Sequence, residues 1–200
     1  MKEVFNNALN ELNNNEEFVV ASVVRTSGST PQKPGSKLLV KKDGTTIGTL
    51  GGGCVEGDIW FASKEILSNG GSAKYQDYVL NEDLAANDGL VCGGTMYFLI
   101  DPYRKEKSDL NNQLLSEMDK AYKGELSLVL ATIINSKNEE MIGQKLILKD
   151  NGDLIGDISD ESLVKSISKE APELINFGTC KTIEEGEVQI FLEGITTDPV

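Results

Sequence analysis

The spacing of apolar residues predicts helices and strands that follow the same order in both halves of the chain. Each half has two segments with apolar positions at helical spacing and several short apolar runs typical of strands. The predicted helices cover about 2–14, 55–69, 110–122 and 160–171. The predicted strands outside the hairpins cover about 17–25, 73–80, 95–101, 126–134, 175–183 and 187–193. Tight two-residue hairpin turns are expected at Asp43-Gly44 and Asn151-Gly152.

A sequence repeat accounts for this order. Residues 35–50 align with 143–158 without a gap at an offset of 108 (143 − 35), and 21–24 align with 131–134 at an offset of 110 (131 − 21). We therefore predict an α/β (mixed α+β) fold of two tandem degenerate repeats, helix-β-β-β-helix-β-β, related by a pseudo-twofold axis. The polar, proline-led segment 102–109 is the expected junction. It separates a motif-bearing repeat, 1–102, from a degenerate repeat, 103–200, which can pack with the first as one body.

The two halves can be compared to separate the needs of the fold from those of function. Both keep the hairpin glycines and the apolar strand positions. Three motifs occur only in the first half: Arg25-Thr-Ser-Gly-Ser-Thr-Pro-Gln-Lys-Pro34, Gly51-Gly-Gly-Cys-Val-Glu56 and Gly89-Leu-Val-Cys-Gly-Gly94. The segment Phe177-Gly-Thr-Cys180 is a candidate remnant of the third motif, and Cys180 itself is expected to be a small hydrophobic residue. The three first-half motifs are therefore the candidates for function.

The motif at 51–56 lies between a predicted strand and a predicted helix. Its three glycines let the backbone approach a ligand closely, and successive N–H groups at a helix start can form an anion-binding nest. The same position favours the thiolate form of Cys54. The alternative is a tight turn with a small buried cysteine, because one glycine is enough for a turn.

The other two motifs also have a functional and a structural interpretation. The motif at 25–34 combines hydroxyls, prolines and cations in an acidic chain, which predicts an anion site where Arg25 holds a phosphate or carboxylate. The alternative is a solvated loop with Ser/Thr turns. The motif at 89–94 places Cys92 between glycines, where the alternative is a β-bulge or close backbone packing. Trp60 and Phe61 are expected in the core.

Composition and charge limit the classes of function. The 200 residues are 39% hydrophobic, which suffices for one or two domains with a core. The net charge of −13 disfavours nucleic acid and membrane surfaces as partners. The absence of histidine excludes Ser-His and Cys-His nucleophile pairs and the common zinc sites. Three cysteines and no apolar segment of signal or membrane-spanning length predict a cytoplasmic protein without a disulfide framework.

The order and spacing of the three motifs resemble the N-terminal domain of the XdhC/CoxI family. That family has an R-T-x-G-S-T-P loop, a G-G-G-C-V-E turn and then G-L-V-C-G-G, and all three are present within residues 15–102. Gln32 departs from the basic residue that usually follows the proline. No strand followed by G-x-G-x-x-G is found, so the resemblance does not extend to the family's C-terminal Rossmann-type domain. A separate Rossmann-domain polypeptide could supply that part.

The resemblance implies an accessory protein, a cofactor chaperone rather than an enzyme. Such a protein binds the molybdenum cofactor (molybdopterin) and assists its sulfuration and its insertion into xanthine dehydrogenase-type molybdenum hydroxylases. Cys54 and Cys92 are the candidates for sulfur chemistry and for ligation of molybdenum, because soft thiolates suit such centres. Glu56 could orient a pterin N–H group or cap the helix. The implied cofactor-binding residues are Arg25, Ser27, Gly28, Ser29, Thr30, Gly51, Gly52, Gly53, Cys54, Glu56, Cys92, Gly93 and Gly94.

Two alternatives to the chaperone stay open at this stage. One is a thiol-based sulfur carrier or transferase that uses Cys54 or Cys92. The other is a non-catalytic adaptor between a molybdoenzyme and a cysteine desulfurase, which are also the partners that the family implies. The degenerate second half, freed from ligand binding, is a candidate seam for a homodimer.

Overall fold

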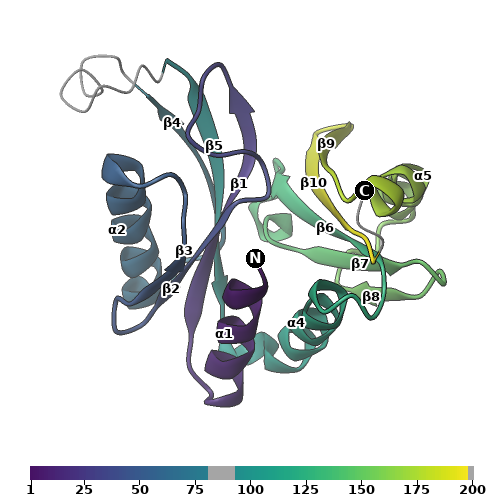
Figure 1. Cartoon of the computed structure of the whole chain (residues 1–200), viewed down its shortest axis with the longest axis horizontal. Helices are drawn as coiled ribbons and strands as arrows, with labels where there is room; N and C mark the ends of the chain where they lie inside the picture. The colour runs from purple at the N-terminus through teal and green to yellow at the C-terminus, as the bar shows by residue number, and fades with distance from the viewer. Residues whose placement is uncertain (81–92, 198–200) are drawn as a thin grey trace.

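The computed structural model describes residues 1–80 and 93–197. Within them the chain forms two antiparallel five-stranded sheets and four α-helices, so the prediction of a mixed α/β fold is confirmed (Figure 1). The elements of the first half are α1 (Lys2–Asn13), β1 (Phe18–Ser27), β2 (Lys37–Lys41), β3 (Thr46–Gly48), α2 (Gly53–Asn69), β4 (Lys74–Val79) and β5 (Thr95–Tyr103). Those of the second are α4 (Ser108–Tyr122), β6 (Leu128–Asn135), β7 (Lys145–Lys149), β8 (Leu154–Gly156), α5 (Glu161–Phe177), β9 (Cys180–Glu185) and β10 (Val188–Ile195).

The two sheets have the same strand order. The first runs β3-β2-β1-β5-β4 and the second β8-β7-β6-β10-β9, with every neighbouring pair antiparallel. The helix-β-β-β-helix-β-β order predicted for each half is therefore present. The pseudo-twofold axis and the common origin of the halves stay predictions.

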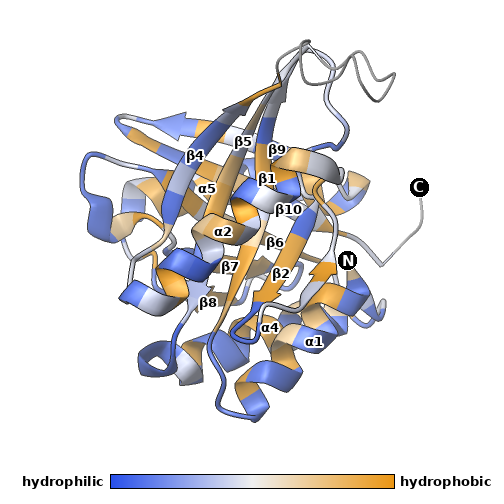
Figure 2. Cartoon of the chain, turned by 90° about the vertical axis from the view of Figure 1, so that its left-hand side faces the viewer, coloured by the Kyte–Doolittle hydropathy of each residue, from blue (hydrophilic) through white to orange (hydrophobic). Residues whose placement is uncertain are grey.

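The molecule is layered, with one helix on each outer face and two helices between the sheets (Figure 1). Helix α2 covers the outer face of the first sheet and α5 that of the second. Their buried positions are Val55, Ile59, Ser63 and Ile66 in α2, and Leu163, Ile167, Ala171 and Leu174 in α5. Each pair is offset by 108 (163 − 55). The strands and the inward helix faces carry most of the hydrophobic residues (Figure 2).

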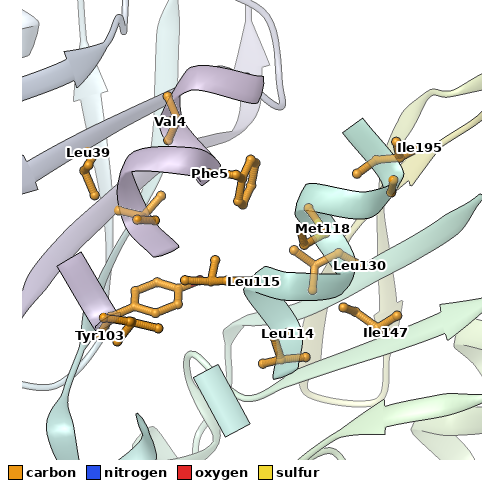
Figure 3. Close-up of a cluster of buried hydrophobic side chains, with 14 of the residues drawn as sticks. Val4, Phe5, Leu39, Tyr103, Leu114, Leu115, Met118, Leu130, Ile147 and Ile195 are labelled. Atoms are coloured by element: carbon orange, nitrogen blue, oxygen red, sulfur yellow. The ribbon is translucent and has the colours of Figure 1, made fainter. Parts of the chain in front are cut away.

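Helices α1 and α4 pack against each other between the two sheets. Phe5 and Leu12 of α1 share one core with Leu115 and Met118 of α4, and this core also takes residues from both sheets (Figure 3). Burial of one large apolar side chain contributes about 1.5–3 kcal/mol. The apolar faces of α1 and α4 therefore bind the two halves together. No helix in the described part of the chain is long and apolar enough to cross a membrane.

Two buried ion pairs also join the halves, and each takes its lysine from a different half. The ammonium of Lys37 lies 2.8 Å from the carboxylate of Glu193 and 3.0 Å from the hydroxyl of Ser22. The ammonium of Lys145 lies 2.5 Å from the carboxylate of Asp101. The strand registers make these pairs equivalent.

In the first sheet Ser22 pairs with Lys37 and Val20 with Asp101, and in the second Thr132 pairs with Lys145 and Leu130 with Glu193. Each half thus supplies a lysine to the other half's carboxylate. The arrangement is that of a self-complementary interface.

Several sequence predictions of local structure were wrong. Strand β5 runs through Pro102 to Tyr103, so the expected junction begins inside a strand. Helix α5 continues past Pro172 to Phe177, and residues 175–177, predicted as strand, are helical. The buried side chain of Leu174 holds this last turn on the core, and the N–H of Gly178 closes it on the carbonyl of Leu174.

The hairpin turns and the aromatic residues of α2 also differ from expectation. The N–H of Lys41 bonds the carbonyl of Thr45, and of the Asp43-Gly44 pair only Gly44 has a positive φ. The loop is therefore longer than the predicted two-residue turn. Phe61 is 63% exposed, and Trp60, 37% exposed, donates its indole N–H to the carbonyl of Gly44. Neither belongs to the buried core.

Loss of one partner of the buried Lys37–Glu193 pair should destabilise the protein. We expect Glu193→Gln to lower the free energy of unfolding by about 3 kcal/mol, because it leaves the Lys37 charge buried without a counter-charge. The double variant Lys37→Met/Glu193→Leu should recover most of this loss. Urea denaturation followed by circular dichroism measures both.

The matched control is Glu187→Gln in the exposed pair Lys137–Glu187. It should change the free energy of unfolding by less than about 0.5 kcal/mol. Equal effects of Glu193→Gln and Glu187→Gln would show that the buried pair does not hold the halves together.

Candidate functional site

The described parts of the three motifs meet at one end of the first sheet. Ser27, at the end of β1, pairs with Thr95, at the start of β5, so the loop after β1 lies beside the glycines that precede β5. A Cβ atom built on Gly94 would lie 2.5 Å from the carbonyl oxygen of Ser27 and 2.7 Å from that of Ser29. One built on Gly28 would lie 2.8 Å from the carbonyl oxygen of Gly93. These positions accept only glycine, because backbone packs directly on backbone.

The same loop also contacts the glycine-cysteine motif. A Cβ atom on Gly51, whose φ is +108°, would lie 2.7 Å from the ring of Pro31. The loop of residues 27–32 therefore touches Gly51 on one side and Gly93–Gly94 on the other. Most of the implied cofactor-binding residues that the structure describes are thus close together.

The glycine-rich turn before α2 is closed by the chain's own carboxylate. Glu56 accepts hydrogen bonds from the backbone N–H groups of Leu50 (2.7 Å) and Gly52 (2.9 Å) and from the hydroxyl of Thr49 (2.6 Å). Burial alone would raise the pKa of Glu56, but these hydrogen bonds hold it below its ordinary value. The expected anion nest is therefore not open at Gly51 and Gly52, whose N–H groups go to Thr49 and Glu56. Of the two roles suggested for Glu56, the capping role is the observed one.

Cys54 lies in the first turn of α2 and is exposed. The N–H groups of a helix's first turn have no intrahelical acceptor, so those of Gly53 and Cys54 point out of the helix end. The equivalent start of α5 has Asp160 as its cap, which accepts from the N–H groups of Ser162 and Leu163. Cys54 corresponds to Ser162 (54 + 108), so only the first half presents a thiol there.

Arg25 lies on the opposite face of the first sheet from α2. Its guanidinium stacks on the ring of Tyr97 at 4.1 Å, and Tyr97 packs on the cluster where the two sheets meet. Contact with Tyr97 raises the pKa of Arg25, partial burial opposes this, and the charge of Glu184 in the second half adds to the increase. Arg25 therefore faces the seam between the halves, apart from Gly51–Cys54, which lie on the α2 side.

The hydroxyl-rich loop is partly engaged with itself. Thr30 donates its hydroxyl to the carbonyl of Gln32, and the side chain of Gln32 accepts from Ser36. Ser27, Gly28 and Ser29 are exposed. The departure at Gln32 thus serves the shape of the loop, and the exposed hydroxyls of Ser27 and Ser29 are those left for a ligand.

The three cysteines have different positions. Cys92 lies outside the described residues, so its roles as a sulfur group and as a molybdenum ligand stay predictions. Cys180 lies just after α5, a position equivalent to the residues just after α2 in the first half. The third motif lies later, between β4 and β5. Phe177-Gly-Thr-Cys180 is therefore not a remnant of the third motif. In the second half β9 and β10 are joined directly through Gly186 and Glu187.

The thiol of Cys180 is next to the buried ion pair, although part of the residue is exposed. A Cβ atom on Gly35 would lie 3.1 Å from its sulfur. Desolvation, together with the carboxylate of Glu193, raises the pKa of Cys180 to about 12. Cys180 therefore has the properties of a structural thiol.

Two other features bear on ligand binding. Within residues 1–80 and 93–197, no group of three or more Cys, Asp or Glu side chains is arranged to hold a metal ion. A cleft of about 630 Å³ lies between the halves, away from the motifs. Its three cations are all paired with carboxylates, as Arg104–Glu17, Lys107–Asp157 and Lys145–Asp101.

Comparisons with known proteins agree with the motifs. Residues 12–78 match the sequence model of the XdhC and CoxI family. Over 98 residues, 48% of this chain, the chain is 34% identical to a Bacillus subtilis (strain 168) protein described as a probable subunit of xanthine dehydrogenase. The resemblance inferred from the motifs is confirmed for the matched segment, which is similar to the XdhC and CoxI family.

The fold also matches a crystal structure described as a xanthine dehydrogenase from Bacillus halodurans. The TM-score is 0.65 at 19% identity, over 94% of this chain and 52% of that one. The Bacillus subtilis relative is covered over only 29% of its length. This chain therefore spans about half, or less, of the length of these two proteins.

A side chain at position 94 should displace the motif loop. We expect Gly94→Ala to lower the free energy of unfolding by about 1–3 kcal/mol, since its methyl group would overlap the carbonyl oxygens of Ser27 and Ser29. The control is Gly57→Ala in α2, where a Cβ atom meets nothing within 4 Å. It should stabilise the protein by about 0.5–1 kcal/mol. A neutral Gly94→Ala in urea denaturation would contradict the close packing of the motifs.

Cys180 should react far more slowly than an ordinary thiol. With its pKa raised to about 12, its thiolate fraction at pH 8 is about 1,000-fold or more below that of an unperturbed cysteine. Timed iodoacetamide labelling, read by peptide mass spectrometry, should show Cys54 labelled before Cys180. Labelling of Cys180 at the rate of a free thiol would contradict its raised pKa.

Proposed function

We propose that this chain binds the molybdenum cofactor and assists its sulfuration and its insertion into a xanthine dehydrogenase-type molybdenum hydroxylase. The family match over residues 12–78 and the descriptions of the two relatives support a role linked to xanthine dehydrogenase. The observation that carries the proposal is the convergence of the three first-half motifs beside the exposed thiol of Cys54.

The residues at this end of the sheet divide into three kinds. The exposed hydroxyls of Ser27 and Ser29 can donate to phosphate oxygens, and the thiol of Cys54 can serve as a soft ligand. Gly28, Gly93 and Gly94 keep the backbone close-packed, so the loop is held in one conformation before a ligand arrives. When bound, the cofactor supplies the molybdenum centre that the client enzyme uses.

The fit to the cofactor is better for some candidate residues than for others. Cys54, Ser27, Gly28, Ser29 and the first-turn N–H groups of α2 can reach one ligand from adjacent positions. Glu56 supports the turn from within. Arg25 faces the other side of the sheet, so we assign it to the seam between the halves.

The partners in this proposal are those that the resemblance to the family implies. Sulfuration requires a sulfur donor, for which we propose a cysteine desulfurase, and delivery requires the client molybdoenzyme.

The exposure of Cys54 also favours a second candidate, a thiol-based sulfur carrier. In that function Cys54 would hold a transferable sulfur without tight binding of the pterin. The two functions differ in one measurable quantity, the pterin bound per protein.

The test is purification from a host that makes molybdopterin, under anaerobic conditions. We expect near-stoichiometric pterin, measured as its fluorescent oxidised form, and molybdenum, measured by mass spectrometry. Cys54→Ala should lower the bound molybdenum at least about tenfold, because the soft ligand is lost. Cys180→Ser, the matched thiol control, should retain both.

Absence of pterin from the wild-type protein would count against the chaperone. A persulfide on Cys54 in the same sample would then favour the sulfur carrier. A loss of pterin in Arg25→Ala as large as that in Cys54→Ala would instead place the phosphate on the seam side of the sheet.

A further inference from the structure

Cys54 has a carboxylate neighbour that the motifs did not indicate. Asp58 lies four residues after Cys54 on α2, and both residues are exposed. Residues four apart on a helix share one face, with Cβ atoms about 5–6 Å apart. The carboxylate of Asp58 therefore lies one helical turn from the thiol of Cys54, on the same side of the helix.

Tyr78 of β4 lies against the same face. It pairs with Met96 of β5 and packs, partly buried, on the core beneath α2. Burial raises the pKa of Tyr78, and the adjacent Asp58 carboxylate and the nearby Cys54 thiol add to the increase. Two residues further on, the N–H of Leu80 bonds the carbonyl of Gly94. Tyr78 thus lies between the start of α2 and the glycines before β5.

Comparison with the equivalent positions of the second half shows which features of this helix face occur only in the first half. Ser166 is equivalent to Asp58 (58 + 108), and Glu185, which pairs with Val188, occupies the place of Tyr78. The hydroxyl of Ser166 donates to the carboxylate of Glu185 at 2.6 Å. A polar contact between helix and edge strand at these positions is therefore common to both halves. Only the first half puts the carboxylate on the helix, one turn from a thiol.

We propose that Asp58, held by Tyr78, is a positioning residue that determines which groups can approach Cys54. Its negative charge disfavours anions at the thiol and favours neutral groups, cations and N–H donors. This inference rests on the proposed function, since it concerns the ligand of that same site. The phosphate of the cofactor would then lie toward Ser27 and Ser29, and an N–H-bearing part of the ligand would lie beside Asp58.

The test measures the charge selectivity of Cys54 with two methanethiosulfonate reagents, one anionic and one cationic. In each reaction the Cys54 thiolate attacks the reagent's sulfenyl sulfur, a new S–S bond forms, methanesulfinate leaves and the thiol proton goes to solvent. Labelling of Cys54 is read by peptide mass spectrometry on the full-length protein. Asp58→Asn should speed the anionic reagent and slow the cationic one, each by about two- to threefold at low salt, as expected for one charge at this spacing.

Two further variants complete the test. Asp77→Asn is the control, because it removes a charge next to Tyr78 in sequence. Successive side chains of a strand point to opposite faces, so Asp77 lies on the other face of β4, where its charge raises the pKa of Tyr75. The charge selectivity of Cys54 should therefore stay as in the wild type. Tyr78→Phe should shift selectivity in the direction of Asp58→Asn by a smaller factor, because Asp58 loses the polar group of Tyr78 beside it.

An unchanged ratio of anionic to cationic rates in Asp58→Asn would overturn the proposal. A wild-type ratio in Tyr78→Phe would overturn the role of Tyr78. These outcomes do not depend on cofactor binding, so failure of the inference can be distinguished from failure of the proposed function. Thermal melting of each variant verifies that it is folded.

Discussion

The reciprocal pairing of buried lysines and carboxylates determines how the two halves fit together. A buried charge is costly unless a counter-charge is in place, and Lys37 finds its partner only in the second half, as Lys145 does in the first. Neither half is therefore complete alone. The two pairs, with the α1–α4 core between them, fix the inner face of each sheet against the other.

The reciprocal pairing uses much of the inner faces of the sheets for packing. These faces also take Arg25, which stacks on Tyr97 and faces Glu184 across the seam. The motifs instead meet at the end of the first sheet on the α2 side. There Gly28, Gly51 and Gly94 let three backbone segments come together beside Cys54. The second half keeps the architecture but has Ser162 and an Asp160 cap at the equivalent helix start.

The sequence predicted much of this because apolar periodicity and the repeat are local signals. The buried faces of the helices and the order of helices and strands along the chain could be inferred from spacing alone. The face to which Arg25 points could not, because a bulge between Val23 and Arg25 shifts the register of β1. Two other features of the site could not be inferred either: the capping of the glycine turn by Glu56, and the presence of Asp58 and Tyr78 beside Cys54. Both depend on side-chain rotamers and on contacts across the sheet, which no short motif encodes. Helix α5 also continues beyond the predicted end near residue 171, since tertiary packing of Leu174 outweighs the helix break expected at Pro172.

Our central proposal is that the ligand site lies in the first half alone. Hydrogen–deuterium exchange, with and without molybdopterin, is the sharpest test, because it reads backbone protection in both halves at once. We expect slower exchange at residues 27–32 and 51–54, and no change at the equivalent second-half segments 135–142 and 159–164. Equal protection of both halves, or protection confined to the second, would show that the site lies elsewhere.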